Sequence, residues 1–338
     1  CTGAHGTPLI PWPNRLADGR YRFDGRDHQT ALTEPAKHNA IHGFLRWRSW
    51  EGIDRDEHRV VMATTLHPMP GYPFTLHVEV AYELTSDGLA VTTTAENRGD
   101  WPCPYGCGSH PYLSPGDGLI DGCTLQLDAA TRITTDAVRQ LPTGTEPVEG
   151  TAFDFRSPRA IGDLQVDFAF TDLTRDDDGR AWTRLTGTDG AEAALWVDRH
   201  HPYIEIYTGD TLPPDKCRRG LGTEPMTCPP NAFATGEDVI RLAVATGVLP
   251  RQVNEVLTAG LAPTATFAQA QRAALMFDAL RRDQNRLPAI DAALGENRER
   301  LARLSTDVSA IAGSGQSIGP TGQVDPQPPQ VLDSDFRE

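Results

Sequence analysis

Regular alternation of apolar and polar residues is the feature that most constrains the fold. From Leu76 to Leu84 every second residue is apolar, and the turn signal Ser86-Asp-Gly88 then leads into a second strand-like run over 89–95. A period of two gives a strand one buried and one solvated face, so these runs predict an antiparallel hairpin. Similar short runs recur at 125–127, 182–185, 193–197, 203–207 and 239–243. Because almost no helical period precedes residue 244, the pattern predicts an all-β sandwich.

Charge and composition narrow the class of partner. The chain has 338 residues and a net charge of −15, which argues against nucleic acid or an anionic membrane surface and favours a neutral small molecule. Its six cysteines are too sparse for a disulfide framework, and Cys103 and Cys107 lack a second pair at metal-ligand spacing. No apolar run is long enough to cross a bilayer. We therefore expect a cytoplasmic protein with no membrane partner, no metal and no cofactor.

Two stiff segments carry the residues with acid/base chemistry. Glu224 stands in a proline-rich stretch, 222–233, that reads as a rigid loop rather than a helix or central strand. His110 follows glycines that free the backbone and precedes Pro111, which restricts it. A histidine and a carboxylate, each held by rigid backbone, are suited to form a general acid/base pair.

Six segments occur in an order that resembles the aldose 1-epimerase (galactose mutarotase) family. They are Pro11–Leu16, Asn39–Gly43, Pro70–Leu76, Gly108–Leu113, Asp167–Phe170 and Glu224–Phe233. The resemblance implies a large antiparallel β-supersandwich over residues 1–243 with a sugar pocket on one concave face. In that family a strand pair normally precedes the counterpart of residue 2, so the resemblance also implies an N-terminally truncated domain.

The same resemblance assigns sugar-binding roles to residues that are ambiguous alone. Arg15 by itself reads as a surface charge, His42 as a structural histidine and Asp167 as a turn residue. By resemblance, Arg15 donates hydrogen bonds to sugar hydroxyls, His42 binds or polarises the substrate, and Asp167 accepts from hydroxyl groups. Asn14 and Tyr112, which lie in the same segments, are expected to contact the sugar as well.

The implied reaction is interconversion of α and β anomers of a free aldohexose. By resemblance, ionised Glu224 removes the proton of the C1 hydroxyl and protonated His110 delivers one to the ring oxygen, so activity is expected to be bell-shaped in pH. Phe168 stands where the family usually has His or Asn, so the preferred aldose stays open. A hexose-6-phosphate 1-epimerase is an alternative that needs converging cations, for which the candidates are Arg46, Arg48, Arg218 and Arg219. A non-catalytic carbohydrate-binding or assembly module is a third possibility.

The character of the chain changes after residue 243. All tryptophans, tyrosines, cysteines and lysines lie before this point. Apolar residues spaced by threes and fours predict a heptad-bearing helix over 287–311, with a weaker helix at 267–283. We therefore expect a helical, coiled-coil-like appendage over 244–312, which could form a homo-oligomer or result from misjoined genes, and a disordered tail over 313–338.

Overall fold

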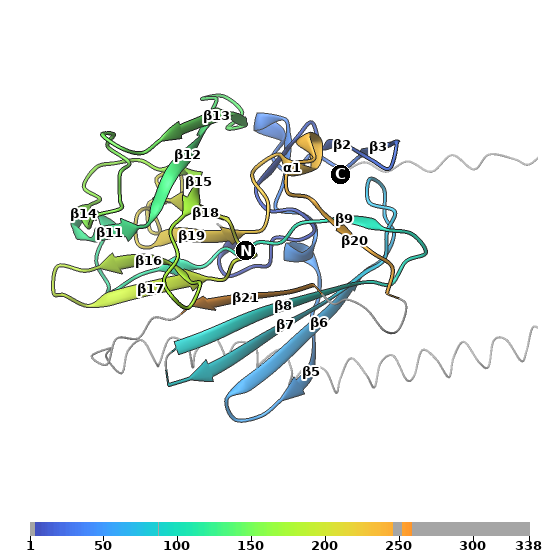
Figure 1. The fold of residues 1–338 in the computed structure, drawn as a ribbon, viewed down its shortest axis with the longest axis horizontal. Helices are drawn as coiled ribbons and strands as arrows, with labels where there is room; N and C mark the ends of the chain where they lie inside the picture. The colour runs from blue at the N-terminus through green and yellow to red at the C-terminus, as the bar shows by residue number, and fades with distance from the viewer. Residues whose placement is uncertain (1–3, 87, 246–251, 259–338) are drawn as a thin grey trace, which may run out of the picture. The chain divides into compact units, whose positions relative to one another are not determined.

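A computed structural model describes residues 4–86 and 88–245 with their side chains and the backbone of residues 252–258. These residues belong to one compact unit that spans Cys1–Ala265. The predicted all-β architecture is confirmed, because the described residues form two large sheets and only short helices (Figure 1). No helix within the described part is both long and apolar enough to cross a membrane.

The larger sheet has nine strands, and all its strand pairs are antiparallel. The predicted hairpin of segments 76–84 and 89–95 lies within it, with Leu76, Val78 and Val80 buried. Its strands, in spatial order, are β14 (Arg159–Ala160), β11 (Thr124–Leu127), β16 (Ala181–Thr186), β17 (Glu192–Val197), β21 (Gln252–Thr258), β8 (Gly88–Asn97), β7 (Leu76–Thr85), β6 (Arg59–Leu66) and β5 (Glu51–Arg55).

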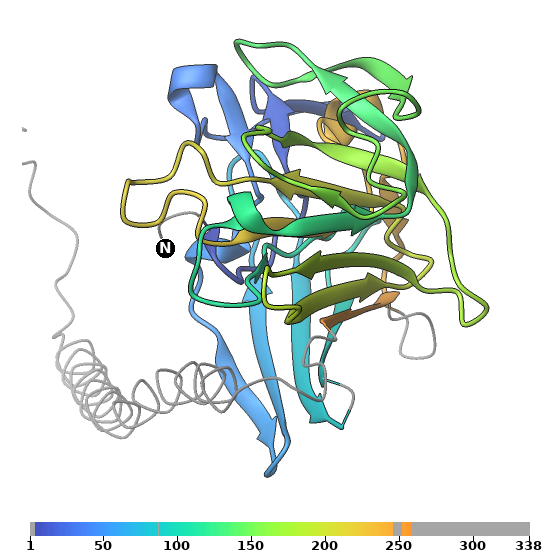
Figure 2. The ribbon, with the colours of Figure 1, turned by 90° about the vertical axis from the view of Figure 1, so that its left-hand side faces the viewer.

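The second sheet has six strands and packs against β11, β16 and β17 of the first (Figures 1 and 2). Side chains from both sheets form one apolar core, including Leu195 and Leu185 from the larger sheet and Phe170, Ile204 and Ile206 from the smaller. Its strands, in spatial order, are β10 (Tyr112–Leu113), β19 (Leu221–Met226), β18 (Tyr203–Tyr207), β15 (Asp167–Leu173), β12 (Ala129–Thr135) and β13 (Pro142–Pro147).

Short elements form a second apolar core with β6, β7 and β8, which includes Leu16, Tyr105 and Leu242 beside Leu76 and Val78. The Asp18-Gly19 turn does not form a hairpin, because the strands before and after it pair with other segments. The hairpin turn is Asp24-Gly25, whose positive φ angles of 48° and 77° suit a two-residue connection. The pairs are β1 (Arg15–Ala17) with β4 (Asn39–Ile41), β2 (Arg20–Phe23) with β3 (Arg26–Gln29), and β9 (Cys103–Tyr105) with β20 (Ile240–Leu242). The helices are η2 (Pro35–Lys37), η3 (Leu45–Trp47), η4 (Ile120–Gly122) and α1 (Ala232–Thr235).

The segment around Glu224 is a strand, not the rigid loop that its prolines suggest. Strand β19 lies between β10 and β18, and all six of its residues are buried. Pro225 is tolerated because β10 pairs only with Leu221 and Gly222, so no ladder partner in β10 requires an N–H at position 225. The carbonyl of Pro225 still accepts a hydrogen bond from Ser109 at 3.3 Å.

The nine-stranded sheet extends beyond residue 243, where the helical appendage was expected to begin. Strand β21 lies between β17 and β8 and pairs with both. The predicted helices at 267–283 and 287–311 and the tail at 313–338 lie outside the described residues.

Gly43 fixes the close approach of two chain segments beside the candidate site. Its φ is +58°, and a Cβ atom there would lie 2.1 Å from the carbonyl oxygen of Ile10. That carbonyl accepts hydrogen bonds from Phe44 and Leu45, so it cannot move without breaking them.

We predict that Gly43→Ala destabilises the protein by at least about 3 kcal/mol, since left-handed strain and a backbone clash add together. The matched control is Gly150→Ala, because Gly150 also has a positive φ, +74°, but open space around it. The control should lose only about 1–2 kcal/mol of strain. Thermal unfolding measures both, and equal losses would contradict the clash.

Candidate active site

Strand register brings three carboxyl groups to one face of the six-stranded sheet. Glu205 of β18 lies directly opposite Glu224 of β19, and Asp167 of β15 lies opposite Tyr207 at the end of β18. Alternate residues of a strand point to opposite faces, so these side chains project away from the core that holds Ile204 and Ile206.

His110 and Glu224, which the sequence places far apart, are in direct contact. The Nε2 atom of His110 lies 3.1 Å from the Oε1 atom of Glu224, and the two residues are only 5% and 3% exposed. The remaining polar atoms, Nδ1 of His110 and Oε2 of Glu224, are buried without a hydrogen-bond partner among the described residues. Unpaired buried polar atoms are costly, and a polar ligand would satisfy them.

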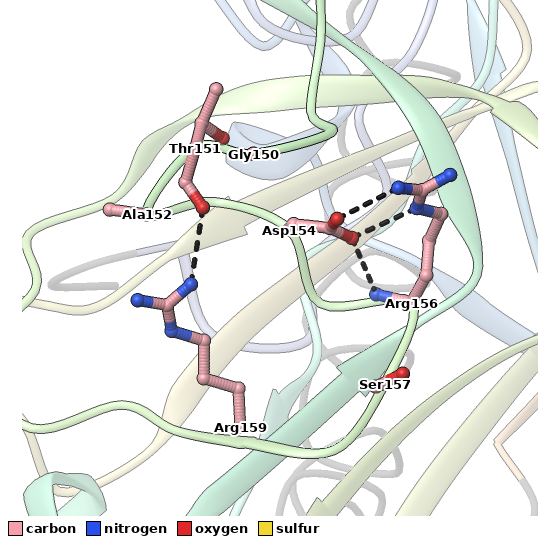
Figure 3. A pocket seen from close by; sticks show the side chains of 7 residues that line it. All are labelled: Gly150, Thr151, Ala152, Asp154, Arg156, Ser157 and Arg159. Atoms are coloured by element: carbon pink, nitrogen blue, oxygen red, sulfur yellow. Dashed lines mark hydrogen bonds and ion pairs between the residues drawn. The ribbon is translucent and has the colours of Figure 1, made fainter.

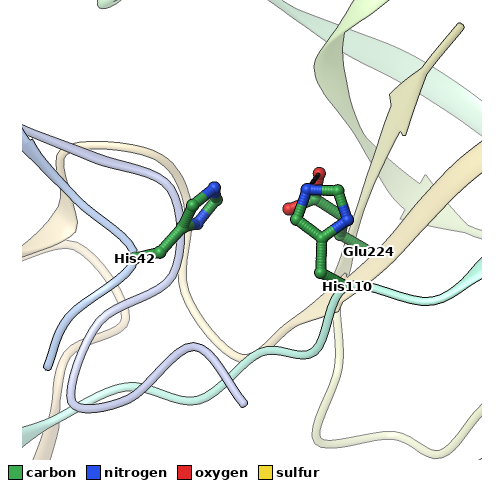
Figure 4. A group of neighbouring side chains, drawn as sticks. All are labelled: His42, His110 and Glu224. Atoms are coloured by element: carbon green, nitrogen blue, oxygen red, sulfur yellow. Dashed lines mark ion pairs between the residues drawn. The ribbon is translucent and has the colours of Figure 1, made fainter. Parts of the chain in front are cut away.

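His42 lies opposite this pair (Figure 4). The ring Nδ1 of His42 accepts a hydrogen bond from the backbone N–H of Asn14 at 3.2 Å. The backbone N–H of His42 donates to the Asn14 carbonyl at 2.9 Å. Since Nδ1 is an acceptor, the neutral ring carries its proton on Nε2. Asn14 therefore sets His42 as a hydrogen-bond donor.

The same tautomer bears on whether the site suits a metal ion. His42, His110 and Glu224 can each offer one ligand atom, and these atoms lie within 4.8 Å of one another. A metal-ligating histidine normally donates its other ring N–H to an acceptor. In His42 that second nitrogen faces a backbone donor instead, so the site fits a hydroxyl-bearing ligand better than a cation.

Arg15 is held beside the carboxyl groups by Glu34. Its Nε and Nη2 atoms donate to the two oxygens of Glu34 at 3.0 and 3.3 Å, and Nη2 lies 4.0 Å from Asp167. No hydrogen bond of Nη1 is seen within the described residues, so this nitrogen can serve a ligand.

Tyr112 contributes by stacking. Its ring lies nearly parallel to that of His110, with centroids 5.0 Å apart, and the ring of His5 also stacks on it with centroids 4.0 Å apart. The stack limits the tilt of the His110 imidazole.

A small cavity joins these groups. It has a volume of about 150 Å³, and its lining includes Arg15, His42, His110, Asp167, Glu205 and Glu224. Pockets for drug-sized ligands are typically about 300–1,000 Å³, so this one suits a single small molecule. The structure thus brings together Glu224, His110, His42, Arg15, Asn14 and Asp167, with Tyr112 directly behind His110.

Burial sets the protonation of the central pair. The pKa of His110 is lowered to about 3, mainly by burial and to a smaller extent by the neighbouring His5 and Arg46. Burial raises the pKa of Glu224 well above its usual range, with Glu205 and Asp167 adding to the increase. The sequence led us to expect an ionised Glu224 and a charged His110, whereas burial favours the proton on Glu224. Both descriptions contain one proton, shared across a 3.1 Å contact.

Glu205 is a site residue that sequence reasoning missed. It is 2% exposed, its Oε2 atom has no hydrogen-bond partner among the described residues, and it lines the cavity. Its pKa is raised to about 8, mainly by burial and also by the neighbouring Asp167, while Arg15 and Asn14 oppose the increase. A signal was present in the run 203–207, where a glutamate separates two buried isoleucines and therefore faces away from the core.

A second hollow, of about 640 Å³, lies elsewhere and is lined by residues of the 150–159 loop (Figure 3). Its charged groups are already paired: Arg156 with Asp154, and Arg159 with the carbonyl of Thr151. None of the side-chain polar atoms that are buried and unpaired in the described part belongs to it. It offers no comparable chemistry.

Comparison with known proteins identifies the family. The sequence model described as "Aldose 1-epimerase" matches residues 2–244. The chain belongs to the aldose 1-epimerase family. This family consists of isomerases that act on carbohydrates, and the resemblance seen in the sequence is confirmed.

Relatives of the aldose 1-epimerase family differ in how much is known of them. The uncharacterized protein YihR of Escherichia coli K12 is 35% identical over 239 residues, which cover 70% of this chain and 74% of that protein. The aldose 1-epimerase of the same bacterium is 27% identical over 65% of this chain and 66% of its own length. The matched region thus spans about two thirds to three quarters of these relatives.

Solved structures of the family share the fold. An aldose epimerase homologue from C. elegans has a TM-score of 0.65 at 19% identity and covers 76% of this chain and 82% of its own. A putative aldose 1-epimerase from E. coli K12 has a TM-score of 0.62 at 21% identity, with coverage of 75% and 82%. The expected galactose mutarotase-like β-fold is therefore confirmed for the described residues.

We predict that Glu205 makes stability fall as pH rises. Its pKa is about 8 in the folded protein, above the usual value of 4.5, so the folded state holds a proton that the unfolded state has released. The contribution of Glu205 to the free energy of unfolding is fully present below about pH 4.5 and is lost as pH rises through about 8.

Glu205→Gln mimics the protonated group. Its melting temperature should match that of wild type near about pH 4 and exceed it at about pH 8–9, a range set by the pKa values of Glu205 in the unfolded and folded states. The exposed Glu51→Gln is the control. A difference in melting temperature between wild type and Glu205→Gln that stays the same across this pH range would contradict the prediction.

Proposed function

We propose that this protein interconverts the α and β anomers of a free aldose by acid/base ring opening and reclosure. The contact between buried His110 and Glu224 supports the proposal most directly, because both groups lie in a cavity sized for one small molecule. A pocket that had degraded into a binding module would not need to keep this pair together.

The chemistry needs one proton removed and one delivered. The carboxylate of Glu224 takes the proton of the C1 hydroxyl while His110 gives its proton to the ring oxygen, so the bond from C1 to the ring oxygen breaks and a carbonyl forms at C1. Rotation about the C1–C2 bond exposes the other face. The C5 hydroxyl then adds to the carbonyl, returning its proton to His110, and Glu224 returns its proton to the C1 oxygen.

The proton distribution that burial favours corresponds to one stage of this cycle. After ring opening, Glu224 is protonated and His110 is neutral, which is the state that burial favours. Binding of the cyclic sugar must therefore move the shared proton from Glu224 to His110. Hydrogen bonds from sugar hydroxyls to the carboxylate would stabilise that shift.

The other cavity groups fit the hydroxyls of a sugar. His42 offers its Nε2 proton, Arg15 offers Nη1, and Asp167 accepts. Alternating donors and acceptors around a small polar cavity are what a polyhydroxylated ligand requires.

A sugar bearing an anionic group, such as a hexose 6-phosphate, is the second candidate. Arg46 favours it, because its Nε atom is buried without a hydrogen-bond partner and its charge acts on both His42 and His110. Arg218 does not, since it is bound by Asp121 and Asp210. Competition by glucose 6-phosphate, lost in Arg46→Gln, would support this variant of the proposal.

We predict that Glu224→Gln and His110→Asn each reduce mutarotation by about 10²- to 10⁴-fold, the usual contribution of a general acid or base. The double variant should be little worse than either single one, because the two groups act as a unit. Polarimetry of freshly dissolved α-D-glucose and α-D-galactose, corrected for the spontaneous rate, measures the loss. Wild-type activity in Glu224→Gln would exclude the mechanism, and Glu51→Gln serves as the control.

We predict that activity falls as pH rises through about 8, where Glu205 ionises. A charged Glu205 beside Glu224 makes Glu224 hold its proton more tightly, while Arg15 and Asp167 are the other charged groups that face Glu205. Glu205→Gln should move this alkaline limb to higher pH. Superimposable pH profiles of wild type and variant would show that Glu205 does not control the limb.

A further inference from the structure

Gln140 connects two sides of the sugar site although it lies outside the cavity lining. Its side-chain oxygen accepts from Nη2 of Arg15 at 2.9 Å and from the ammonium of Lys37. Its side-chain nitrogen donates to Oδ2 of Asp167. One amide therefore bridges two cations, Arg15 and Lys37, and the carboxylate of Asp167 in β15. Both cations lie more than a hundred positions before Gln140 in the sequence.

The loop that carries Gln140 is itself firmly held. Both carboxylate oxygens of Asp136 accept backbone N–H groups across the loop, from Val138, Arg139 and Leu141. Gln140 adopts a positive φ of 55°, a conformation that non-glycine residues rarely use. Such a conformation persists only where the surrounding contacts fix it.

Arg139 anchors the same loop to the segment that carries Arg15. Its guanidinium donates to the carbonyls of Lys37 and His38 and to Asp18, and its own carbonyl accepts from the side chain of Asn39 at 2.9 Å. Gln140 is thus presented to Arg15 and Asp167 from a fixed platform.

The bridge decides which atoms remain for a ligand. With Nε and Nη2 of Arg15 occupied by Glu34 and Gln140, Nη1 is left as a donor. Oδ2 of Asp167 accepts from Gln140 and the same carboxylate shares a hydrogen bond with Glu205, so of its roughly four lone pairs at least one is left as an acceptor. A donor and an acceptor fixed side by side match two adjacent hydroxyl groups of a pyranose, one accepting and one donating.

We propose that Gln140 is a positioning residue of the sugar site: its amide orients Arg15 and Asp167 so that together they read a pair of adjacent hydroxyls. This inference rests on the proposed function, because it takes the ligand to be an aldose. Gln140 does not touch the reacting atoms, so it governs affinity and hydroxyl discrimination and leaves the proton transfers unchanged.

The test separates the side chain of Gln140 from its backbone. Gln140→Gly removes the amide and accepts the positive φ without strain. Gln140→Glu keeps the oxygen that faces Arg15 and Lys37 but replaces the donor to Asp167 with a second carboxylate oxygen. Val138→Ala is the control, because Val138 lies in the same loop and is 76% exposed. Calorimetric affinity for D-glucose, D-galactose and their monodeoxy analogues, KM and kcat, and melting temperature are measured for each.

We expect Gln140→Gly to weaken sugar affinity and raise KM by about tenfold, the effect of losing one well-placed hydrogen bond to a charged group, with kcat within about twofold of wild type. Its melting temperature should stay close to that of the control. Gln140→Glu should lose at least as much affinity. The ratio of affinities between the parent sugar and its most weakened deoxy analogue should shrink in both variants, which a purely structural defect would not cause.

The effect should also depend on Asp167. In an Asp167→Ala background, Gln140→Gly should cost less affinity than it does in wild type, because part of its role has gone. Unchanged affinity in Gln140→Gly, full additivity with Asp167→Ala, or a loss that merely follows melting temperature would overturn the inference. If wild type binds sugar without interconverting anomers, the proposed function fails while the affinities still decide the role of Gln140. If wild type binds neither sugar, both fall.

Discussion

The antiparallel register of β15, β18 and β19 is the constraint on which the site depends. Direct pairing of Glu205 with Glu224 places two carboxyl groups side by side on a face that the rest of the chain then covers. Burying like charges this close is unfavourable unless cations, hydrogen-bond donors or protons compensate. The short elements between residues 14 and 42 provide those groups, so the covering layer and the sheet face are mutually dependent.

Protons supply the rest of the compensation. Glu205 and Glu224 both have raised pKa values, so the site is close to neutral charge despite its acidic residues. A neutral but strongly polar cavity suits hydroxyl groups, and the raised pKa values let both carboxyl groups keep a proton at a pH where a free carboxyl group has lost it. The same burial that is unfavourable for charged carboxylates therefore raises the pKa values of these groups, which suits them to proton transfer.

Sequence reasoning succeeded where the signal is local. The alternation in 76–84, 89–95 and 203–207 predicted strands that the structure contains, and stiff backbone near His110 and Glu224 led to the two residues that meet in the cavity. It failed where pairing decides the outcome. Strand β19 can contain Pro225 because β10 is short and pairs only with Leu221 and Gly222, so it needs no N–H from residue 225. No local sequence pattern shows how long the neighbouring strand is.

The role of Glu205 was missed for the same reason. Its alternation within 203–207 shows that it faces away from the core, but only the register with β19 shows that it faces a second carboxylate. Gln140 is harder still, because it belongs to a loop with no regular pattern and its partners are distant in sequence.

Strand β21 has a practical implication for work with shortened forms of the chain. It occupies the slot between β17 and β8, so a protein trimmed to the 2–244 segment would be left with two bare strand edges facing each other across that slot. Unsatisfied edges recruit β-segments from neighbouring molecules. Precipitation of such a trimmed form would therefore indicate that β17 and β8 have lost the strand between them. It would give no information on whether the candidate site is intact.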